Sequence, residues 1–322
     1  MQNMESVKTD IVDFLKHGRL RSLVMKGLRG GRKIPPFLML RLLALAGLKN
    51  GYFSPKEARL LIMPGRFRPK GLTDKYWKFL DDEAQKELRP FLTGENSVTL
   101  YGRPFHFPTA WEGDNGYHYL AALLLQITVF DQYHFAENHR PGGVIIDAGA
   151  NIGAFSVFAA HVDPSAKIYA FEPQPEMFAF LKENVKELPN VACYNLGLGE
   201  TEARRTMYGH TFEDSGFGVY DKVNGKEAAI TTVDDFVKKN GLPKIDFIKM
   251  DTEGYEGQIL SGAKDTVRRF GPVITMSAYH HKGDEKRLKD ILLAANPDYV
   301  CELKTECEPD LLCVPKPALR NK

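Results

Sequence analysis

The segment Val144–Gly153 constrains the fold of this chain more than any other. It reads Val-Ile-Ile-Asp-Ala-Gly-Ala-Asn-Ile-Gly, a short apolar run that ends in an acid and a glycine turn. Such a run predicts a buried strand. Glycine in the turn lets a ligand approach the backbone closely, and a helix behind the turn offers free N–H groups. The sequence therefore predicts a strand–turn–helix unit with a ligand site at the turn.

Short β-branched runs alternate with amphipathic segments from about residue 141 onward. The expected strands are Val144–Asp147, Lys167–Phe171, Val191–Tyr194, Ile245–Met250, Val273–Met276 and a last pair near residues 299–302 and 311–314. The expected helices are Ile152–His161, Pro175–Leu188, Val233–Lys239 and Asp284–Ala295. This alternation predicts an α/β fold, a doubly wound and mostly parallel sheet with a terminal antiparallel strand. Residues 199–230 interrupt it and indicate an inserted hairpin or a lid; composition does not choose between the two.

Three regions are expected along the 322 residues. Residues 1–95 predict a basic, mostly helical extension, because apolar segments there begin with proline or with a capping box. Residues 96–140 predict a short hairpin followed by a linking helix. Residues 141–322 form the α/β domain.

Positive charge is concentrated in residues 14–56, although the whole chain carries only +2. This segment contains ten Lys or Arg and no Asp or Glu. Its apolar run Ile34–Leu48 reaches about 22 Å as a helix, short of a hydrocarbon layer of roughly 30 Å, and it contains Arg41, which disfavours a membrane span. We expect a cytoplasmic protein that binds reversibly to the anionic inner face of a membrane, with a helical subdomain as the alternative. Nucleic acid is a weaker candidate, because the remaining chain is acidic and no recognition motif accompanies the charge.

Glu172 ends the strand that follows the glycine turn. A carboxylate at the tip of the second strand of a doubly wound sheet faces the ligand crevice, where it can accept both hydrogen bonds of a ribose diol. This placement predicts a nucleoside ligand, with capping of the helix near Pro175 as the alternative. The turn departs from the NAD fingerprint, because Ala150 stands where a second glycine makes room for a pyrophosphate.

Four motifs together resemble the FkbM family of S-adenosylmethionine-dependent methyltransferases. They are Asp147–Gly153, Phe171–Pro173, Thr232–Phe236 and Ile248–Glu256, and the resemblance covers about residues 130–295. It implies a class I, Rossmann-like methyltransferase fold. In such folds the first loop holds the methionine part of the cofactor, here with Asp147, Gly149, Ala150, Asn151 and Gly153.

The resemblance also implies roles for residues beyond the first loop. Glu172 would hold the ribose of S-adenosylmethionine. Asn195 and Leu196, which follow the third strand, would flank the adenine. Asn195 could instead end its strand in a turn, so both roles stay open.

Asp251 and His280 are the candidate catalytic residues. Methyl transfer is an in-line displacement, so the enzyme chiefly positions the acceptor and removes its proton. If the fourth strand lies beside the first and the fifth beside the fourth, these two residues emerge at one edge as a base and its orienting partner. Histidine suits this role because its pKa lies close to working pH. Loop capping for Asp251 and a simple strand-end position for His280 are the alternatives.

A divalent metal is compatible with the sequence but is not demanded by it. Glu253 and Glu256 could join Asp251 around Mg²⁺, which prefers hard oxygen ligands. None of the four cysteines forms a C-x-x-C pair, which disfavours a zinc or thioredoxin-like site. Cys301 and Cys313 could face each other across a terminal hairpin and form a disulfide in an oxidising compartment.

The resemblance implies O-methylation of a hydroxyl on a sugar, lipid-linked or natural-product acceptor. The chain lacks an N-P-P-Y or D-P-P-Y motif after the fourth strand, which disfavours methylation of adenine N6. Two alternatives are kept: a binding or scaffold protein that holds the cofactor without turnover, and an NAD-dependent oxidoreductase.

Overall fold

A computed structural model describes residues 92–94, 96–108, 120, 123–129, 131–208, 211–212, 225–305 and 308–316. The chain divides into two compact units, Met1–Asp131 and Gln132–Lys322. The basic segment 14–56 and the helices expected before residue 92 lie outside the described residues.

The described part of the first unit contains the hairpin expected from the sequence. Strands β1 (Leu92–Gly94), β2 (Ser97–Leu100) and β3 (Arg103–His106) form an antiparallel sheet in that order. Tyr101 and Gly102 make the two-residue turn with φ of 51° and 79°, as the right-handed twist of a hairpin requires. Part of the expected linking helix is described and contains a π-helical turn, Leu125–Val129.

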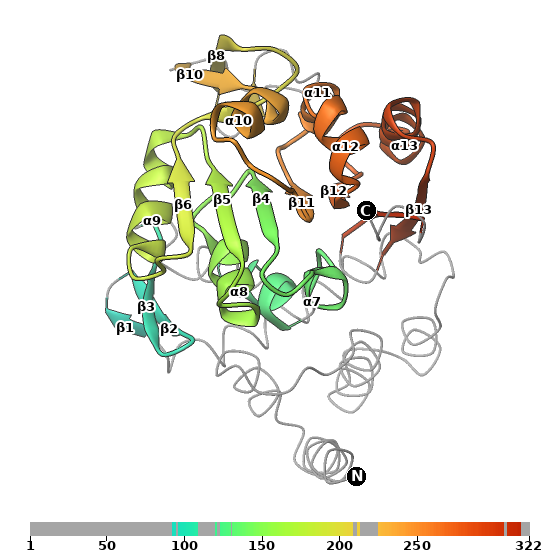
Figure 1. Cartoon of the computed structure of the whole chain (residues 1–322). Helices are drawn as coiled ribbons and strands as arrows, with labels where there is room; N and C mark the ends of the chain where they lie inside the picture. The colour runs from blue at the N-terminus through green and yellow to red at the C-terminus, as the bar shows by residue number, and fades with distance from the viewer. Residues whose placement is uncertain are drawn as a thin grey trace, which may run out of the picture. The chain divides into compact units, whose positions relative to one another are not determined.

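The second unit is built on a seven-stranded sheet with the order β13-β14-β12-β11-β4-β5-β6 (Figure 1). Its strands are β4 (Val144–Ala148), β5 (Lys167–Phe171), β6 (Val191–Tyr194), β11 (Phe247–Met250), β12 (Val273–Ser277), β13 (Tyr299–Lys304) and β14 (Asp310–Pro315). Among these strands, β14 runs antiparallel to both of its neighbours, β12 and β13, and the other pairs are parallel. The sheet therefore has the class I methyltransferase arrangement expected from the sequence. The strand order reverses between β4 and β11, and ligands of doubly wound sheets bind at such a switch point.

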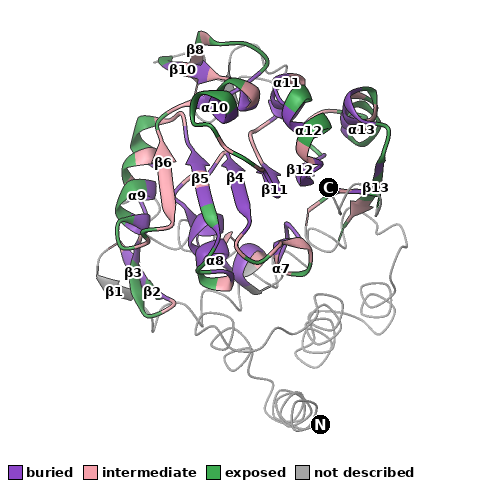
Figure 2. Cartoon of the chain, viewed as in Figure 1, coloured by how far each residue is buried: buried purple, intermediate pink, exposed green. Residues whose placement is uncertain are grey.

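Helices cover the sheet in two groups. One group is α7 (Phe135–Asn138), α8 (Ala154–Val162) and α9 (Pro175–Val185), and the other is α10 (Val233–Lys239), α11 (Glu256–Ser261), α12 (Lys264–Phe270) and α13 (Asp284–Ala295). Figure 2 shows buried central strands between helices whose outer faces are exposed. Alternate strand residues such as Ile146, Ile248 and Met276 belong to the core beneath the second group.

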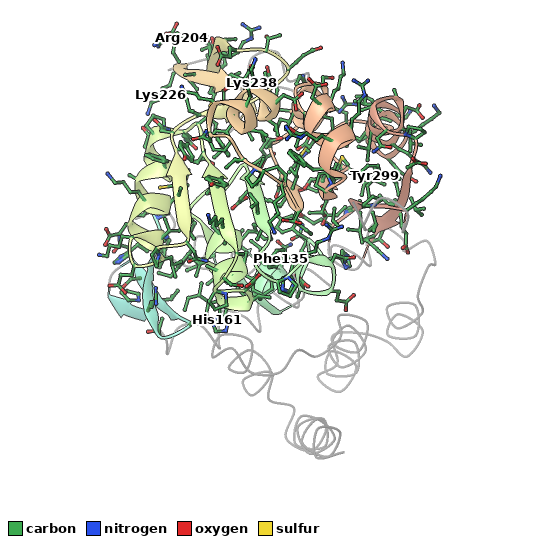
Figure 3. All side chains as sticks on the ribbon, in the orientation of Figure 1. Phe135, His161, Arg204, Lys226, Lys238 and Tyr299 are labelled. Atoms are coloured by element: carbon green, nitrogen blue, oxygen red, sulfur yellow. A yellow bond between two sulfur atoms is a disulfide. The ribbon has the colours of Figure 1, made fainter. Side chains whose placement is uncertain are left out.

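The opposite face of the sheet packs through aromatic rings. Phe135 of α7, labelled in Figure 3, contacts Phe155 and Phe158 of α8 and Phe247 of β11. These ring centroids lie 5.1 to 6.3 Å apart, the range of favourable edge-to-face pairs. The contacts tie α7 and α8 to the middle of the sheet.

The inserted segment contains an antiparallel hairpin. Strands β8 (Ala203–Tyr208) and β10 (Lys226–Thr231) pair with each other in a small sheet that also holds β7 (Gly197–Leu198) and β9 (Thr211–Phe212). Lys226, labelled in Figure 3, forms an ion pair with Glu176 of α9. Residues 213–224 lie outside the described residues, so the lid role stays a prediction.

Cys301 and Cys313 are directly opposite each other in the β13–β14 pair and form a disulfide. The sequence left this pairing open, and the structure contains it because the two positions share one antiparallel register. Cys193 is a free thiol, and Cys307 lies outside the described residues. Among the described helices, none combines the length and the apolar character needed to cross a bilayer.

Candidate active site

The loop after β4 is pressed against the loop after β11. Gly149 has φ of +72°, and a Cβ atom built there would lie 1.9 Å from the carbonyl oxygen of Asp251. Only glycine permits this approach. The backbone N–H groups of Gly149 and Ala150 both donate to the carbonyl of Phe171, at 3.1 and 2.9 Å. The glycine turn, the tip of β5 and Asp251 are therefore neighbours at one edge of the sheet.

Glu172 lies at the tip of β5 and is 7% exposed. One carboxylate oxygen accepts the N–H of Asn151 at 2.8 Å, and the other accepts the N–H of Gln174 at 2.9 Å. Burial raises the pKa of Glu172 to about 7, against these two hydrogen bonds, which lower it. Gln174 is the residue before α9, so Glu172 supports that helix and also joins it to the glycine turn. This bond to the N–H of Gln174 is not a side-chain cap of α9, and the contact of Glu172 with ribose stays a prediction.

Asn195 holds the backbone beside Glu172. Its side chain donates to the carbonyls of Glu172 and Pro173, at 2.9 and 3.0 Å. Asn195 is exposed and Leu196 is half-buried. The contacts of Asn195 match the turn role, and the adenine contact of both residues stays a prediction.

Asp147 is fully buried below the glycine turn, with no exposed surface. Ser156 of α8 donates to one carboxylate oxygen at 2.6 Å, and Lys249 of β11 forms an ion pair with the other at 3.1 Å. Asp147 and Lys249 are register partners of the β4–β11 pair. The Asp147 side chain therefore supports the glycine turn from within the protein, and its role in cofactor binding stays a prediction.

Lys249 was not among the residues expected in the site. Its ammonium group donates to the carbonyls of Gly149 at 2.6 Å and Ala148 at 3.3 Å, and it lies 5.2 Å from the ring centre of Tyr133. The residue is only 3% exposed. The available signal is one lysine inside the otherwise apolar strand Phe-Ile-Lys-Met, since a buried lysine requires a partner.

Asp251 and His280 emerge at the same edge of the sheet, as the expected strand order requires. The Nε2 atom of His280 lies 4.0 Å from Oδ1 of Asp251. Tyr133 donates its hydroxyl to Oδ2 of Asp251 at 2.6 Å. The Asp251 side chain is 24% exposed, so it is the accessible member of this group. Tyr133 precedes the first motif in the chain, and the sequence offered no spacing signal for it.

His280 lies between two further carboxylates. Its Nε2 is 3.4 Å from Glu253, and its Nδ1 is 3.3 Å from Glu256. Burial lowers the pKa of His280, but its interactions with Glu253, Glu256 and Asp251 outweigh burial and raise the pKa to about 10. His280 is then an imidazolium at neutral pH, contrary to the expectation of a histidine base with an ordinary pKa. In this arrangement Asp251 can accept a proton, and His280 orients and balances charge.

Glu256 is the most enclosed carboxylate of the cluster, with no exposed surface. The backbone N–H and the hydroxyl of Thr252 donate to its Oε1, at 2.8 and 3.0 Å. Asp251, Glu256 and His280 each offer one ligand atom, and these atoms lie within 4.8 Å of one another. The sequence suggested Glu253 and Glu256 as partners of Asp251 without demanding a metal; the structure groups Asp251 with Glu256 and His280.

Two further carboxyl groups lie at the beginning of the antiparallel strand β14. Glu308, just before β14, accepts hydrogen bonds from Tyr279 at 2.8 Å and from Gln132 at 3.4 Å. Asp310, the first residue of β14, accepts one from Ser277 at 3.2 Å. Burial and the charge of Asp251 raise the pKa of both carboxyls. The sequence did not indicate these residues, because no motif accompanies them.

Comparison with known proteins finds a family whose sequences are similar to part of this chain. Residues 147–300 match the family described as the methyltransferase FkbM domain. The 31-O-demethyl-FK506 methyltransferase FkbM of Streptomyces tacrolimicus is 27% identical over 159 residues, which are 39% of this chain and 61% of that protein. The 2-O-methyltransferase NoeI of Sinorhizobium fredii is 26% identical over 150 residues, which are 40% of this chain and 61% of that protein. The matches thus span about three fifths of the length of these relatives.

Among solved structures, a methyltransferase FkbM from Methylobacillus flagellatus is similar to this chain. It is 21% identical, with a TM-score of 0.43. The similarity covers 61% of this chain and 54% of that one.

Proposed function

Because residues 147–300 belong to the methyltransferase FkbM family, we propose that this chain methylates a hydroxyl group with S-adenosylmethionine. The proposed acceptor is a sugar, a lipid-linked molecule or a natural product. Two relatives whose names specify O-methylation support oxygen as the acceptor atom.

The observation that carries the proposal is the contact between the glycine turn and Asp251. Because a Cβ at Gly149 would overlap the Asp251 carbonyl, the cofactor loop and the candidate base share one edge of the sheet. Group transfer requires donor and acceptor to be held within near-attack distance. A chain that only stored a nucleoside would have no need for a proton acceptor at this position.

S-adenosylmethionine supplies, when bound, a methyl carbon activated by the sulfonium charge. The Glu172 carboxylate would hold its ribose hydroxyls. Asp251 would accept the proton of the hydroxyl group that receives this methyl group. The Tyr133 hydroxyl fixes one oxygen of Asp251 and leaves the other toward His280 and the acceptor. The surrounding carboxylates also supply the hard oxygen donors that a divalent cation requires.

Two measurements test the proposal. Thermal shift and calorimetry compare S-adenosylhomocysteine with NAD, and we expect binding of the former only. Methyl-labelled S-adenosylmethionine is then incubated with hydroxylated saccharides and lipid-linked saccharides, and we expect label on an acceptor oxygen. Binding of NAD alone would contradict the proposal and favour the oxidoreductase. Binding of S-adenosylhomocysteine without transfer to any acceptor would favour the scaffold.

A further inference from the structure

We propose that Asp251, Glu256 and His280 bind a divalent cation, Mn²⁺ or Mg²⁺, at the acceptor side of this site. Their ligand atoms lie within 4.8 Å of one another. Metal–ligand bonds of about 2.0–2.6 Å separate two ligands of one ion by about 3 Å when adjacent and by about 4–5 Å when opposite. The spacing therefore fits a single ion.

The backbone places two of the three ligands beside regular elements. Asp251 directly follows β11, and Glu256 begins α11. Glu253 and Gly254 have φ of 54° and 95°, so the chain turns back sharply between these two ligands. The two donors from Thr252 fix Oε1 of Glu256, so that side chain is oriented in advance. Such supporting hydrogen bonds are typical of residues that hold a metal.

Unsatisfied buried oxygens give a second, independent reason to expect a cation. Oε2 of Glu256 and Oδ2 of Asp310 are buried and have no hydrogen-bond partner within the described part of the chain. Glu256 is 0% exposed and Asp310 is 1% exposed. A buried carboxylate oxygen without a partner is costly, and buried charges are normally paired or coordinate a metal.

The charges around Asp251 are strongly unbalanced. The carboxyl groups of the cluster are those of Asp251, Glu253, Glu256, Glu308 and Asp310. Before an ion binds, protonated His280 offsets one of them, while the nearby Lys249 is already paired with Asp147. His280 must release its proton to ligate the ion, so a divalent cation would raise the positive charge of the cluster by one.

The ligand set narrows the choice of ion. Two carboxylate oxygens favour Mg²⁺, Ca²⁺ or Mn²⁺, while an imidazole nitrogen favours transition metals. Mn²⁺ satisfies both preferences, and Mg²⁺ satisfies the oxygens. The inference rests on the proposed function, because the ion would lie where the acceptor hydroxyl meets Asp251 and would make that hydroxyl easier to deprotonate.

Mn²⁺ binding to the full chain tests the site without an acceptor. The protein is stripped with EDTA, dialysed and titrated with Mn²⁺ while free Mn²⁺ is followed by electron paramagnetic resonance. We expect one saturable site with a micromolar to submillimolar dissociation constant. Glu256→Gln and His280→Gln should each weaken it by about tenfold or more.

Glu308→Gln is the matched control, because it makes the same carboxyl-to-amide change in the cluster without removing a proposed ligand. We expect it to change the dissociation constant by less than about threefold. Circular dichroism checks that each variant is folded. If the buried Glu256 variant does not fold, Mn²⁺ binding is measured with Asp251→Asn in its place. If Glu308→Gln weakened Mn²⁺ binding as much as the ligand variants do, the cluster would attract cations only through its overall charge, and the proposal would be overturned.

The absence of saturable binding in the wild-type chain would also overturn it. In that case His280 keeps its ring proton between Glu253 and Glu256. Binding of S-adenosylhomocysteine to the stripped protein is measured in parallel. If that binding persists while Mn²⁺ binding is absent, the metal inference fails and the methyltransferase proposal stands; if it is lost in metal-free and metal-loaded protein alike, the methyltransferase proposal fails.

Discussion

The Glu172 carboxylate joins the glycine turn to α9, and we predict that it also binds the ribose of the cofactor. Glu172→Ala removes a charged hydrogen-bond acceptor, which should weaken binding of S-adenosylhomocysteine by about 1.5 to 3 kcal/mol. Calorimetry measures the change, and Glu187→Ala on the exposed side near α9 serves as the control. An unchanged dissociation constant would leave Glu172 with its structural role alone.

The raised pKa of Glu172 predicts a dependence of stability on pH. The folded protein holds the Glu172 proton up to about pH 7, whereas the unfolded chain releases it near pH 4.5. The folded state therefore binds more protons between these values, and the free energy of unfolding falls as pH rises through that window. This difference between the two pKa values corresponds to about 3 kcal/mol of the free energy of unfolding. The protein has lost that amount once the pH exceeds about 7.

Glu172→Gln removes this titration. Urea unfolding without cofactor should show the variant gaining about 3 kcal/mol relative to wild type between pH 4.5 and 8. The comparison uses the difference between the two proteins, because other groups titrate in both. Parallel stability curves across this range would show that the buried carboxyl keeps its ordinary pKa.

Asp251 and His280 should affect turnover more than cofactor binding. Asp251→Asn removes the proposed proton acceptor, and His280→Ala removes the charge that faces it. Each should lower turnover about 10²-fold or more on an identified acceptor while leaving the affinity for S-adenosylhomocysteine unchanged. Asp290→Asn, on the exposed face of α13, is the control. Wild-type turnover in both variants would move deprotonation to another group, such as Glu253.

Between elements, the buried pair of Lys249 and Asp147 joins β11, β4 and α8 below the cofactor loop. Lys249→Met leaves the Asp147 carboxylate buried without its cation, which should lower the free energy of unfolding by about 3–5 kcal/mol. The double variant with Asp147→Asn should recover part of this loss, because no uncompensated charge remains. Urea unfolding at neutral pH measures all three proteins.

Lys244→Met provides the matched control. Lys244 forms an ion pair with Asp246 at 3.0 Å, but its side chain is 45% exposed. Such a pair contributes about 0–1 kcal/mol, so its removal should change stability little. Equal losses for Lys244→Met and Lys249→Met would mean that burial of the Lys249 pair has no special effect.

Much of the element order follows from local sequence patterns. Strand β5 and helices α10 and α13 begin and end where the sequence predicts. In α10 the side chain of Thr232 also caps the first turn. The helix expected from Ile152 begins at Ala154 instead, since the turn extends through Gly153 with φ of 93°. The strand expected from Ile245 begins at Phe247.

Other parts of the site depend on packing that no local pattern records. Asp251 and His280 were predictable because strand order places two strand ends side by side. Tyr133, Lys249 and Glu308 reach the same edge from a loop, a strand face and the start of an antiparallel strand. The pKa of His280 likewise depends on neighbours brought in by the fold, so its ordinary value misled the assignment of the base.

At the scale of the whole molecule, charge separates residues 14–56 from the rest of the chain. That segment carries +10, whereas residues 57–322 sum to −6. A segregated basic segment is attracted to anionic lipid, where each Lys or Arg contributes about 1 kcal/mol near the surface. A lipid-linked acceptor would lie on that same surface. We therefore expect the full chain to bind anionic vesicles reversibly.

Vesicle sedimentation measures this binding, with anionic and neutral lipid at low and high salt. The full chain should pellet with anionic vesicles at low salt and be released at high salt, since mobile ions screen exposed charges beyond about 10 Å at 0.1 M. A matched full-length variant replaces five basic residues with glutamine: Lys16, Arg19, Arg21, Lys26 and Arg29. Five lost charges should reduce partitioning by a factor on the order of 10³ at low salt. Equal pelleting with neutral lipid would assign the binding to apolar contacts, and no pelleting with either lipid would leave the segment as a helical subdomain.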